Sequence, residues 1–279
     1  MYNIDRPVRR VRTATLALLA GAVLLLALAP LTQARGHATA TAAKPTIVLV
    51  HGAWADASSW SGVIQRLQHA GYTVNAPPNL LRGLDTDSKY IAAYLKSIKG
   101  PIILAGHSYG GAVITDAATG NANVKALVYI DAFIPDEGES AGQLTAARPG
   151  SQLDPKTSFA VAPFPGAPAG AVDLYLTPDA VSKNFAQDTS TVIKARLASI
   201  QRPLASNALT DKSTAPAWKT IPSWAVIGTE DRLIPPAEQV FMTGRAHSKV
   251  TKVKASHVSL VSQPGAVSKV ILKAARAEA

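Results

Sequence analysis

Cysteine is absent from the 279 residues of this chain. Its absence excludes disulfide bonds, thiolate chemistry, cysteine-ligated metals and a lipid-modified N-terminal cysteine. No pair of histidines or carboxylates has the spacing of metal ligands beyond what chance gives, so we expect no metal. Internal repeats are also missing, and 47% hydrophobic residues are enough for one sizeable core.

Positive charge is plentiful, but it is unevenly placed. The formal net charge is +10, of which residues 1–43 contribute +4 through five arginines and one aspartate. The remaining +6 includes no dense run of Lys and Arg with interleaved aromatic residues, so we expect no nucleic-acid partner. A mildly basic, soluble surface is the better interpretation.

Residues 1–43 have the layout of a secretory signal peptide followed by a short linker. A positively charged stretch precedes an uncharged run rich in Ala and Leu, and small-x-small cleavage sites follow at Ala34, Ala40 and Ala42. We expect export, with no stable membrane association once the leader is cleaved. The alternative is an uncleaved membrane anchor, because the apolar run is close to the length that spans a bilayer.

From Lys44 onward, short apolar runs alternate with helix-patterned segments, which indicates a parallel sheet covered by helices on both faces. The predicted strands are 47–50, 72–76, 101–105, 124–130, 223–228 and 250–254. The predicted helices are 58–68, capped by Ser58 or Ser59; one opened by Asp85 or Asp87 with Tyr90, Ile91, Tyr94, Leu95 and Ile98 on its apolar face; 112–118; one from about Pro236; and 263–275.

Residues 136–215 interrupt this alternation. Pro, Gly, Ala and Ser dominate there, with scattered aromatic and aliphatic residues and a predicted helix near Thr189–Ile200. Because so many apolar groups would be poorly placed in water, we interpret the segment as a lid folded over one edge of the sheet. The core would then comprise residues 44–135 and 216–279.

The Gly-x-Ser-x-Gly motif at residues 106–110 lies between a predicted strand and a predicted helix. This context predicts a nucleophile elbow, a strained turn that lifts the Ser108 hydroxyl above the sheet. Gly106 and Gly110 leave room for that turn, and Gly111 lets the helix pack close to the strand.

A serine nucleophile needs a base that takes its proton and an acid that orients the base. Asp231 and His257 each follow a predicted strand, and they come after Ser108 in the order that this architecture requires. Since ligands of open α/β sheets bind at the carboxyl ends of the strands, the three side chains should converge there. Asp131, at the end of its own strand, is the rival acid, and Glu230 adjoins Asp231.

The other histidines are weaker candidates for the base. His247 precedes the last strand, His69 is on a helix, and His37 belongs to the predicted leader. His51 and His107 flank glycines of the two loops nearest Ser108, where histidines usually act as hydrogen-bonded supports.

Two backbone amides are needed for the oxyanion of an acyl-transfer intermediate. One should be the N–H of Tyr109, after the nucleophile, and the other that of Ala53, in the loop after the first strand. Trp54 and Trp60 are candidates for lining the acyl pocket, and their alternative role is plain core packing.

With these motifs, residues 44–279 resemble the α/β-hydrolase superfamily. Residues 50–54, 106–111 and 256–257 are similar to the plant methylesterase and hydroxynitrile lyase group, and residues 53–60 and 135–140 look still closer to bacterial carboxylesterases of the pyrethroid-hydrolase type. The resemblance implies an α/β-hydrolase fold, with a mostly parallel sheet flanked by helices and an inserted lid. It also implies a Ser108–Asp231–His257 triad and no cofactor.

Two departures favour ester hydrolysis over cyanohydrin cleavage. The lyase branch typically carries threonine after the first loop's histidine and Glu-Ser-Cys around the nucleophile, whereas this chain has Gly52, and has His107 and Tyr109 around Ser108. We expect a secreted serine carboxylesterase that hydrolyses small to medium hydrophobic esters through an acyl-enzyme. Lyase-like chemistry, perhydrolase chemistry on the same triad and a non-catalytic ligand-binding homologue are the alternatives.

Overall fold

The computed structural model describes residues 44–278, and the predicted leader lies outside them. Six parallel strands form one sheet in the order β2-β1-β3-β4-β8-β9. They are β1 (Thr46–Val50), β2 (Val74–Asn75), β3 (Ile102–His107), β4 (Val124–Ile130), β8 (Ser223–Gly228) and β9 (Lys249–Val253). The predicted α/β fold with a parallel sheet is confirmed. Within the described residues, no helix has the length and apolar character needed to cross a bilayer.

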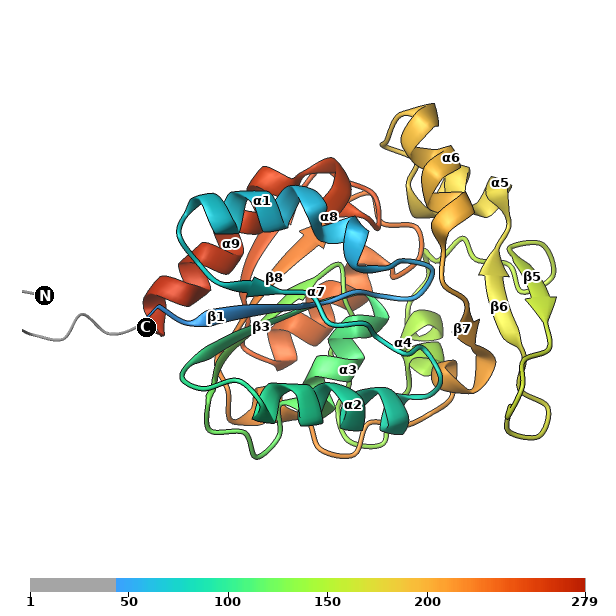
Figure 1. Ribbon diagram of the computed structural model, residues 1–279. Coiled ribbons are helices and arrows are strands. Elements are labelled where there is room, and N and C mark those ends of the chain that lie inside the picture. The colour runs from blue at the N-terminus through green and yellow to red at the C-terminus, as the bar shows by residue number, and fades with distance from the viewer. Residues whose placement is uncertain (1–43, 279) are drawn as a thin grey trace, which may run out of the picture. The chain divides into compact units, whose positions relative to one another are not determined.

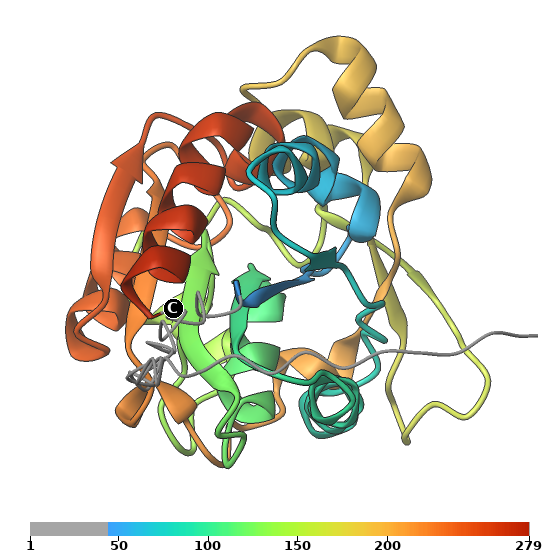
Figure 2. The same cartoon turned by 60° about the vertical axis from the view of Figure 1, so that its left-hand side comes forward.

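Helices cover both faces of this sheet, and its strands β3 and β8 are accordingly buried along their whole length. On one face α9 (Pro264–Ala277) packs on the sheet, with α1 (Ser61–His69) and α8 (Ser259–Ser262) beside it. On the opposite face lie α2 (Leu84–Lys96) and α3 (Tyr109–Ala117), while α7 (Pro236–Arg245) packs on β8. Figures 1 and 2 show the helical layers on the two sides of the sheet.

The register of the strands brings their carboxyl ends to one edge. Gly106 of β3 pairs with Val50 of β1 on one side and with Tyr129 of β4 on the other. In turn Ile130 of β4 pairs with Val226 of β8. The loops that follow these strands therefore start close together, and they carry the predicted site residues.

The start of α1 differs from the prediction. Residues Ala57–Trp60 form a short 3-10 helix, η1, and Asp56 caps it by accepting a hydrogen bond from the backbone N–H of Ser58. The α-helix begins only at Ser61. The cap is thus the aspartate that precedes the two predicted serines.

The start of α2 also differs. This helix begins at Leu84, one residue before the predicted Asp85. Asp87 is fully buried, and its carboxylate accepts hydrogen bonds from the Tyr109 hydroxyl and the Arg82 amide instead of capping the helix. Tyr90, predicted on the apolar face, is 40% exposed.

Between β4 and β8 lies the segment that the sequence analysis interprets as a lid. We call it the cap below and take it as residues 136–215. It contains a small antiparallel sheet in the order β5-β6-β7, and Figure 1 shows it beyond the carboxyl ends of the large sheet's strands. The sequence indicated one of its helices, α6, but neither the small sheet nor the other helices. The cap elements are α4 (Ala141–Ala147), β5 (Phe159–Ala162), β6 (Asp173–Leu176), α5 (Pro178–Ala180), the π-helical turn η2 (Val181–Phe185), α6 (Thr191–Ile200), β7 (Leu204–Ala205) and the 3-10 turn η3 (Ser206–Leu209); a further turn, η4 (Ala217–Lys219), leads to β8.

Candidate active site

Ser108 lies in the turn between β3 and α3, with φ 53° and ψ −124°. A positive φ is costly for a side chain other than glycine and persists only where the surroundings impose it. Here the Ser108 amide donates to Ile130 O (3.1 Å), and the Ser108 carbonyl accepts from the amides of Gly111 (2.9 Å) and Phe133 (3.2 Å). These three hydrogen bonds fix the strained turn.

Glycines surround this turn because no side chain fits. A Cβ at Gly106 would lie 2.5 Å from Gly110 O, and one at Gly52 would lie 2.7 Å from the Cβ of Ser108. The sequence predicted that Gly111 allows close packing against the strand. Its nearest neighbour is instead Phe133 O, 2.5 Å from a Cβ placed there, in the segment after β4.

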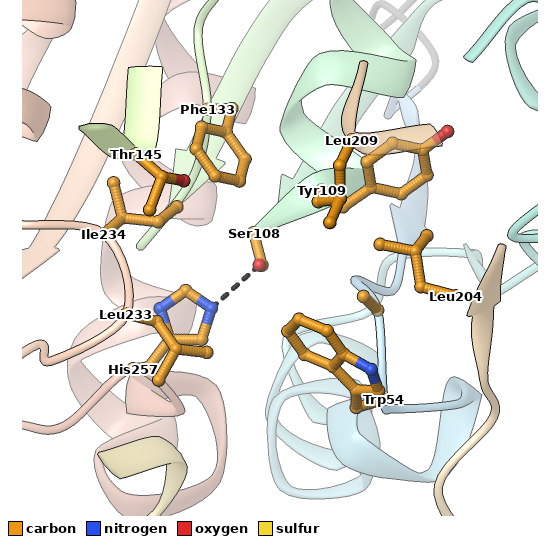
Figure 3. Close-up of a pocket in the computed structure, with 11 residues that line it drawn as sticks. Trp54, Ser108, Tyr109, Phe133, Thr145, Leu204, Leu209, Leu233, Ile234 and His257 are labelled. Carbon is orange, nitrogen blue, oxygen red and sulfur yellow. Dashed lines mark hydrogen bonds between the residues drawn. The ribbon is translucent and has the colours of Figure 1, made fainter. Parts of the chain in front are cut away.

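The predicted nucleophile, base and acid meet at the carboxyl edge of the sheet. Ser108 Oγ lies 2.7 Å from His257 Nε2, and His257 Nδ1 lies 2.7 Å from Asp231 Oδ2. All three residues are buried. Figure 3 shows the imidazole facing the serine hydroxyl, with their hydrogen bond drawn. The hydroxyl can pass its proton to Nε2 while Nδ1–H donates to the carboxylate.

Asp231 is held from both sides. Its Oδ1 accepts hydrogen bonds from the amides of Leu233 (2.8 Å) and Ile234 (3.1 Å). Its Oδ2 accepts from Gln239 Nε2 (2.7 Å) in addition to His257. Sequence analysis missed Gln239, whose only signal is its place in the first turns of the helix that follows the acid loop.

The two rival carboxylates have other partners. Asp131 is fully buried, and it accepts hydrogen bonds from the amides of Gly228 (2.7 Å) and Ser259 (3.0 Å). It therefore ties together the loops that carry Asp231 and His257. Glu230 is exposed and lies 3.7 Å from Lys254. Neither makes a hydrogen bond to the ring of His257.

Burial and the two carboxylates set the protonation of this site. Burial, together with the nearby charge of Asp231, raises the pKa of Asp131 to about 7. Burial by itself would lower the pKa of His257, but the charge and hydrogen bond of Asp231 outweigh it, so the His257 pKa is raised. Asp231 thus favours a protonated imidazole, the form that a base takes after accepting a proton.

The flanking histidines are supports, as the sequence indicated. His107 Nε2 donates to the backbone carbonyl of His257 (2.9 Å). His51 Nε2 accepts from the Asn79 amide (3.0 Å), and burial lowers the His51 pKa to about 4. His69 and His247 are exposed and lie away from the site.

The two residues predicted to donate backbone amides lie at the same cavity. Ala53 and Tyr109 both line it together with Ser108. Within residues 44–278, neither amide has a backbone acceptor. Tyr109 is also the first residue of α3, where the helix dipole favours negative charge.

The cavity above Ser108 has a volume of about 30 Å³, which holds one or two water molecules. Figure 3 shows Phe133, Thr145 and Ile234 to one side of Ser108, and Leu204 and Leu209 to the other. Trp54 lines the cavity, whereas Trp60 is fully buried elsewhere in the core. The cavity is lined by Ala53, Trp54, Ser108, Tyr109, Phe133, Thr145, Leu204, Leu209, Leu233, Ile234 and His257.

Among residues 44–278, no group of three or more His, Asp and Glu side chains is arranged to hold an ion.

This arrangement agrees with a comparison against protein families. Residues 47–270 match the model of the alpha/beta hydrolase family, which covers most of the chain. The chain belongs to the α/β-hydrolase family. The superfamily resemblance predicted from the sequence motifs is thereby confirmed.

Individual relatives are named for different activities. A carbendazim-hydrolysing esterase of Nocardioides sp. (strain SG-4G) is 35% identical over 106 residues, which are 33% of this chain and 44% of that protein. An α-hydroxynitrile lyase of Arabidopsis thaliana is 32% identical over 107 residues, 33% of this chain and 42% of that protein. The chain thus matches less than half the length of each of these two relatives.

A solved structure shares the whole fold. The pyrethroid hydrolase of Sphingobium faniae JZ-2 superposes with a TM-score of 0.66 at 20% identity, covering 84% of this chain and 98% of that chain. At this identity the likeness concerns the fold alone.

Proposed function

We propose that this α/β-hydrolase is a serine carboxylesterase that works through an acyl-enzyme. The observation that carries the proposal is the chain of two 2.7 Å hydrogen bonds from Ser108 Oγ through His257 to Asp231. Such a chain turns a poor nucleophile into a reactive one because the proton has a prepared acceptor.

In the first half of the reaction, Ser108 Oγ attacks the ester carbonyl carbon while its proton moves to His257 Nε2. The carbonyl oxygen becomes negative and accepts hydrogen bonds from the amides of Ala53 and Tyr109. The intermediate then collapses: the bond to the alcohol oxygen breaks, and His257 gives that oxygen the proton. Asp231 stabilises the imidazolium throughout.

In the second half, water takes the place of the alcohol. His257 removes a proton from the water as its oxygen attacks the acyl carbon, and the same two amides hold the second oxyanion. When the bond to Ser108 Oγ breaks, His257 returns the proton to the serine and the carboxylic acid leaves.

The lining of the cavity supports uncharged, hydrophobic esters as substrates. Its polar side-chain atoms other than those of Ser108 and His257 already have partners. Thr145 Oγ1 donates to Ala141 O (2.9 Å), and the Tyr109 hydroxyl donates to Asp87 (2.9 Å). Because these O–H donors are already engaged, a substrate substituent that accepts hydrogen bonds would lose its water without gaining a donor, which is unfavourable.

Substitution of Ser108 by alanine tests the proposal. We expect Ser108→Ala to abolish turnover of 4-nitrophenyl acetate and covalent labelling by a fluorophosphonate. Ser97→Ala is the matched control, because this exposed serine only donates to Tyr94 O at the end of α2. Turnover that persists in a folded Ser108→Ala protein would refute the assignment.

The same protein samples distinguish the alternatives. A ligand-binding homologue without catalysis would leave Ser108 unlabelled in the wild type. A lyase would release aldehyde from a cyanohydrin, and Gly52 and Tyr109 stand where the lyase branch carries threonine and cysteine. We expect ester turnover and labelling without aldehyde release.

A further inference from the structure

Trp54 connects the loop that holds Ala53 to the cap at two separate points. Its backbone amide donates to Arg202 O (3.1 Å), and its indole Nε1 donates to Leu174 O (2.9 Å). Its ring also packs on Phe159 of β5, with 5.6 Å between the ring centres. Three segments of the cap, far apart in the sequence, thus converge on one core residue.

The backbone of Trp54 is strained. Its φ is 56°, a left-handed value that a bulky side chain rarely adopts. Such a conformation persists only where its surroundings hold it, and the two hydrogen bonds to the cap do so. The bond from the Trp54 amide holds the peptide unit that joins Ala53 to Trp54, and it thereby restrains the backbone on one side of the Ala53 amide.

The ring of Trp54 is also a wall of the cavity. Figure 3 shows it below Ser108, with Leu204 nearby. At about 30 Å³ the cavity leaves room for little more than water beside Ser108, so a longer acyl group needs space that a shift of the Trp54 ring would open. A displacement of Trp54 enlarges the cavity and breaks its contacts with the cap.

We propose that Trp54 is the specificity-determining residue of this site. It limits the length of the acyl chain, and it couples the position of the cap to the oxyanion amide of Ala53. This inference rests on the proposed esterase function. Each additional methylene must displace the ring and weaken its two bonds to the cap, so short acyl groups are preferred.

The test is Trp54→Phe, which keeps an aromatic ring but removes the Nε1–H donor. Trp60→Phe is the matched control, because the buried Trp60 Nε1 has no hydrogen-bond partner within residues 44–278. The readout is the ratio of kcat/KM for 4-nitrophenyl octanoate to that for 4-nitrophenyl acetate. Removal of the Nε1–H leaves the Leu174 carbonyl without that donor, so the ring is attached to the cap by one hydrogen bond fewer and is displaced more easily. We therefore expect Trp54→Phe to raise this ratio about tenfold and Trp60→Phe to leave it unchanged.

The positioning of Ala53 gives a second readout. Since a misplaced amide stabilises the transition state less, Trp54→Phe should lower kcat for the acetate ester beyond any change in KM. Phe159→Ala loosens the same contact from the cap side and does not change a residue that lines the cavity. It should raise the octanoate-to-acetate ratio in the same direction, and it carries the test if Trp54→Phe does not fold.

Three outcomes would overturn the inference: an unchanged ratio in an active Trp54→Phe protein, an equal shift in Trp60→Phe, or an unchanged ratio in Phe159→Ala. Failure of the esterase proposal has a different signature, which is a wild-type protein without Ser108-dependent hydrolysis of any ester. The two failures are therefore distinguishable in one set of assays.

Discussion

Asp231→Asn is the substitution that most directly tests the geometry of the site. The Asp231 carboxylate accepts four hydrogen bonds, two on each oxygen. Asparagine replaces one of these acceptor oxygens by an NH₂ group, which only donates. The change therefore keeps the size of the side chain and inverts the polarity of one side.

The two orientations of that amide have different costs. If NH₂ takes the place of Oδ1, it faces the amide N–H groups of Leu233 and Ile234, and each buried donor left without an acceptor costs about 1–3 kcal/mol. If NH₂ takes the place of Oδ2, it donates to His257 Nδ1, and the one donor that loses an acceptor is Gln239 Nε2, which still donates to Ile234 O (3.0 Å). The second orientation loses less, so we expect it to predominate.

This orientation inverts the tautomer of His257. With Nδ1 accepting a hydrogen bond, the proton resides on Nε2, which then cannot accept the proton of Ser108. In a serine triad of this kind, the wrong tautomer lowers kcat about 10⁴-fold while the geometry stays intact. We expect a loss of that order, with little change in KM because Asp231 does not line the cavity.

The assay is steady-state hydrolysis of 4-nitrophenyl acetate, with Asp131→Asn as the matched control. Asp131 supports the loops of Gly228 and Ser259 without touching the His257 ring, so its replacement should lower kcat by no more than about tenfold, the equivalent of one hydrogen bond. Thermal melting verifies that both variants fold. Equal losses in two folded variants, or a full rate in Asp231→Asn, would refute the assignment of the acid.

Two further predictions concern the pH dependence of the reaction and the room for a side chain at two glycines. Because the base must be neutral to accept a proton and the His257 pKa is raised, kcat/KM should rise with pH through an apparent pKa above the ordinary 6.5; a profile with its midpoint below 6.5 would contradict this. Gly52→Ala should lower both the rate of fluorophosphonate labelling and the melting temperature, since its Cβ would lie 2.7 Å from that of Ser108. Gly244→Ala, in α7 with open space around it, should instead raise the melting temperature slightly, and equal effects of the two would contradict the steric explanation.

The large sheet could be predicted from the sequence because its central strands are short apolar runs, and such runs recur along the chain. Strand β3 is apolar up to its final His107 and β4 is apolar apart from Lys125, and each strand is bounded by proline or polar residues. Helix starts were less predictable, because several neighbouring residues can cap. Ahead of α1, the residue that caps η1 is Asp56, whose carboxylate accepts hydrogen bonds from both the amide and the hydroxyl of Ser58.

The contacts of the cap could not be predicted, since they depend on long-range pairing. Strands β5, β6 and β7 have two to four residues each, too few for a periodic pattern. The role of Gln239 could not be predicted for a similar reason. A glutamine in a helix indicates no function by itself, and only the fold brings its amide group beside Asp231. The roles of Ser108, Asp231 and His257 could be predicted because each residue lies in the loop or turn that follows a strand.

The two outermost strands of the large sheet have a consequence for handling the protein. Strand β2 has only two residues, and the exposed outer strand β9 carries Lys249 and Lys252, with Lys254 directly after it. Adding a strand from a second molecule at β9 would bring these ammonium groups next to their own copies, and β2 offers too short a template. We therefore expect concentrated solutions to resist ordered aggregation through sheet extension, and increasingly less so as salt screens the lysines.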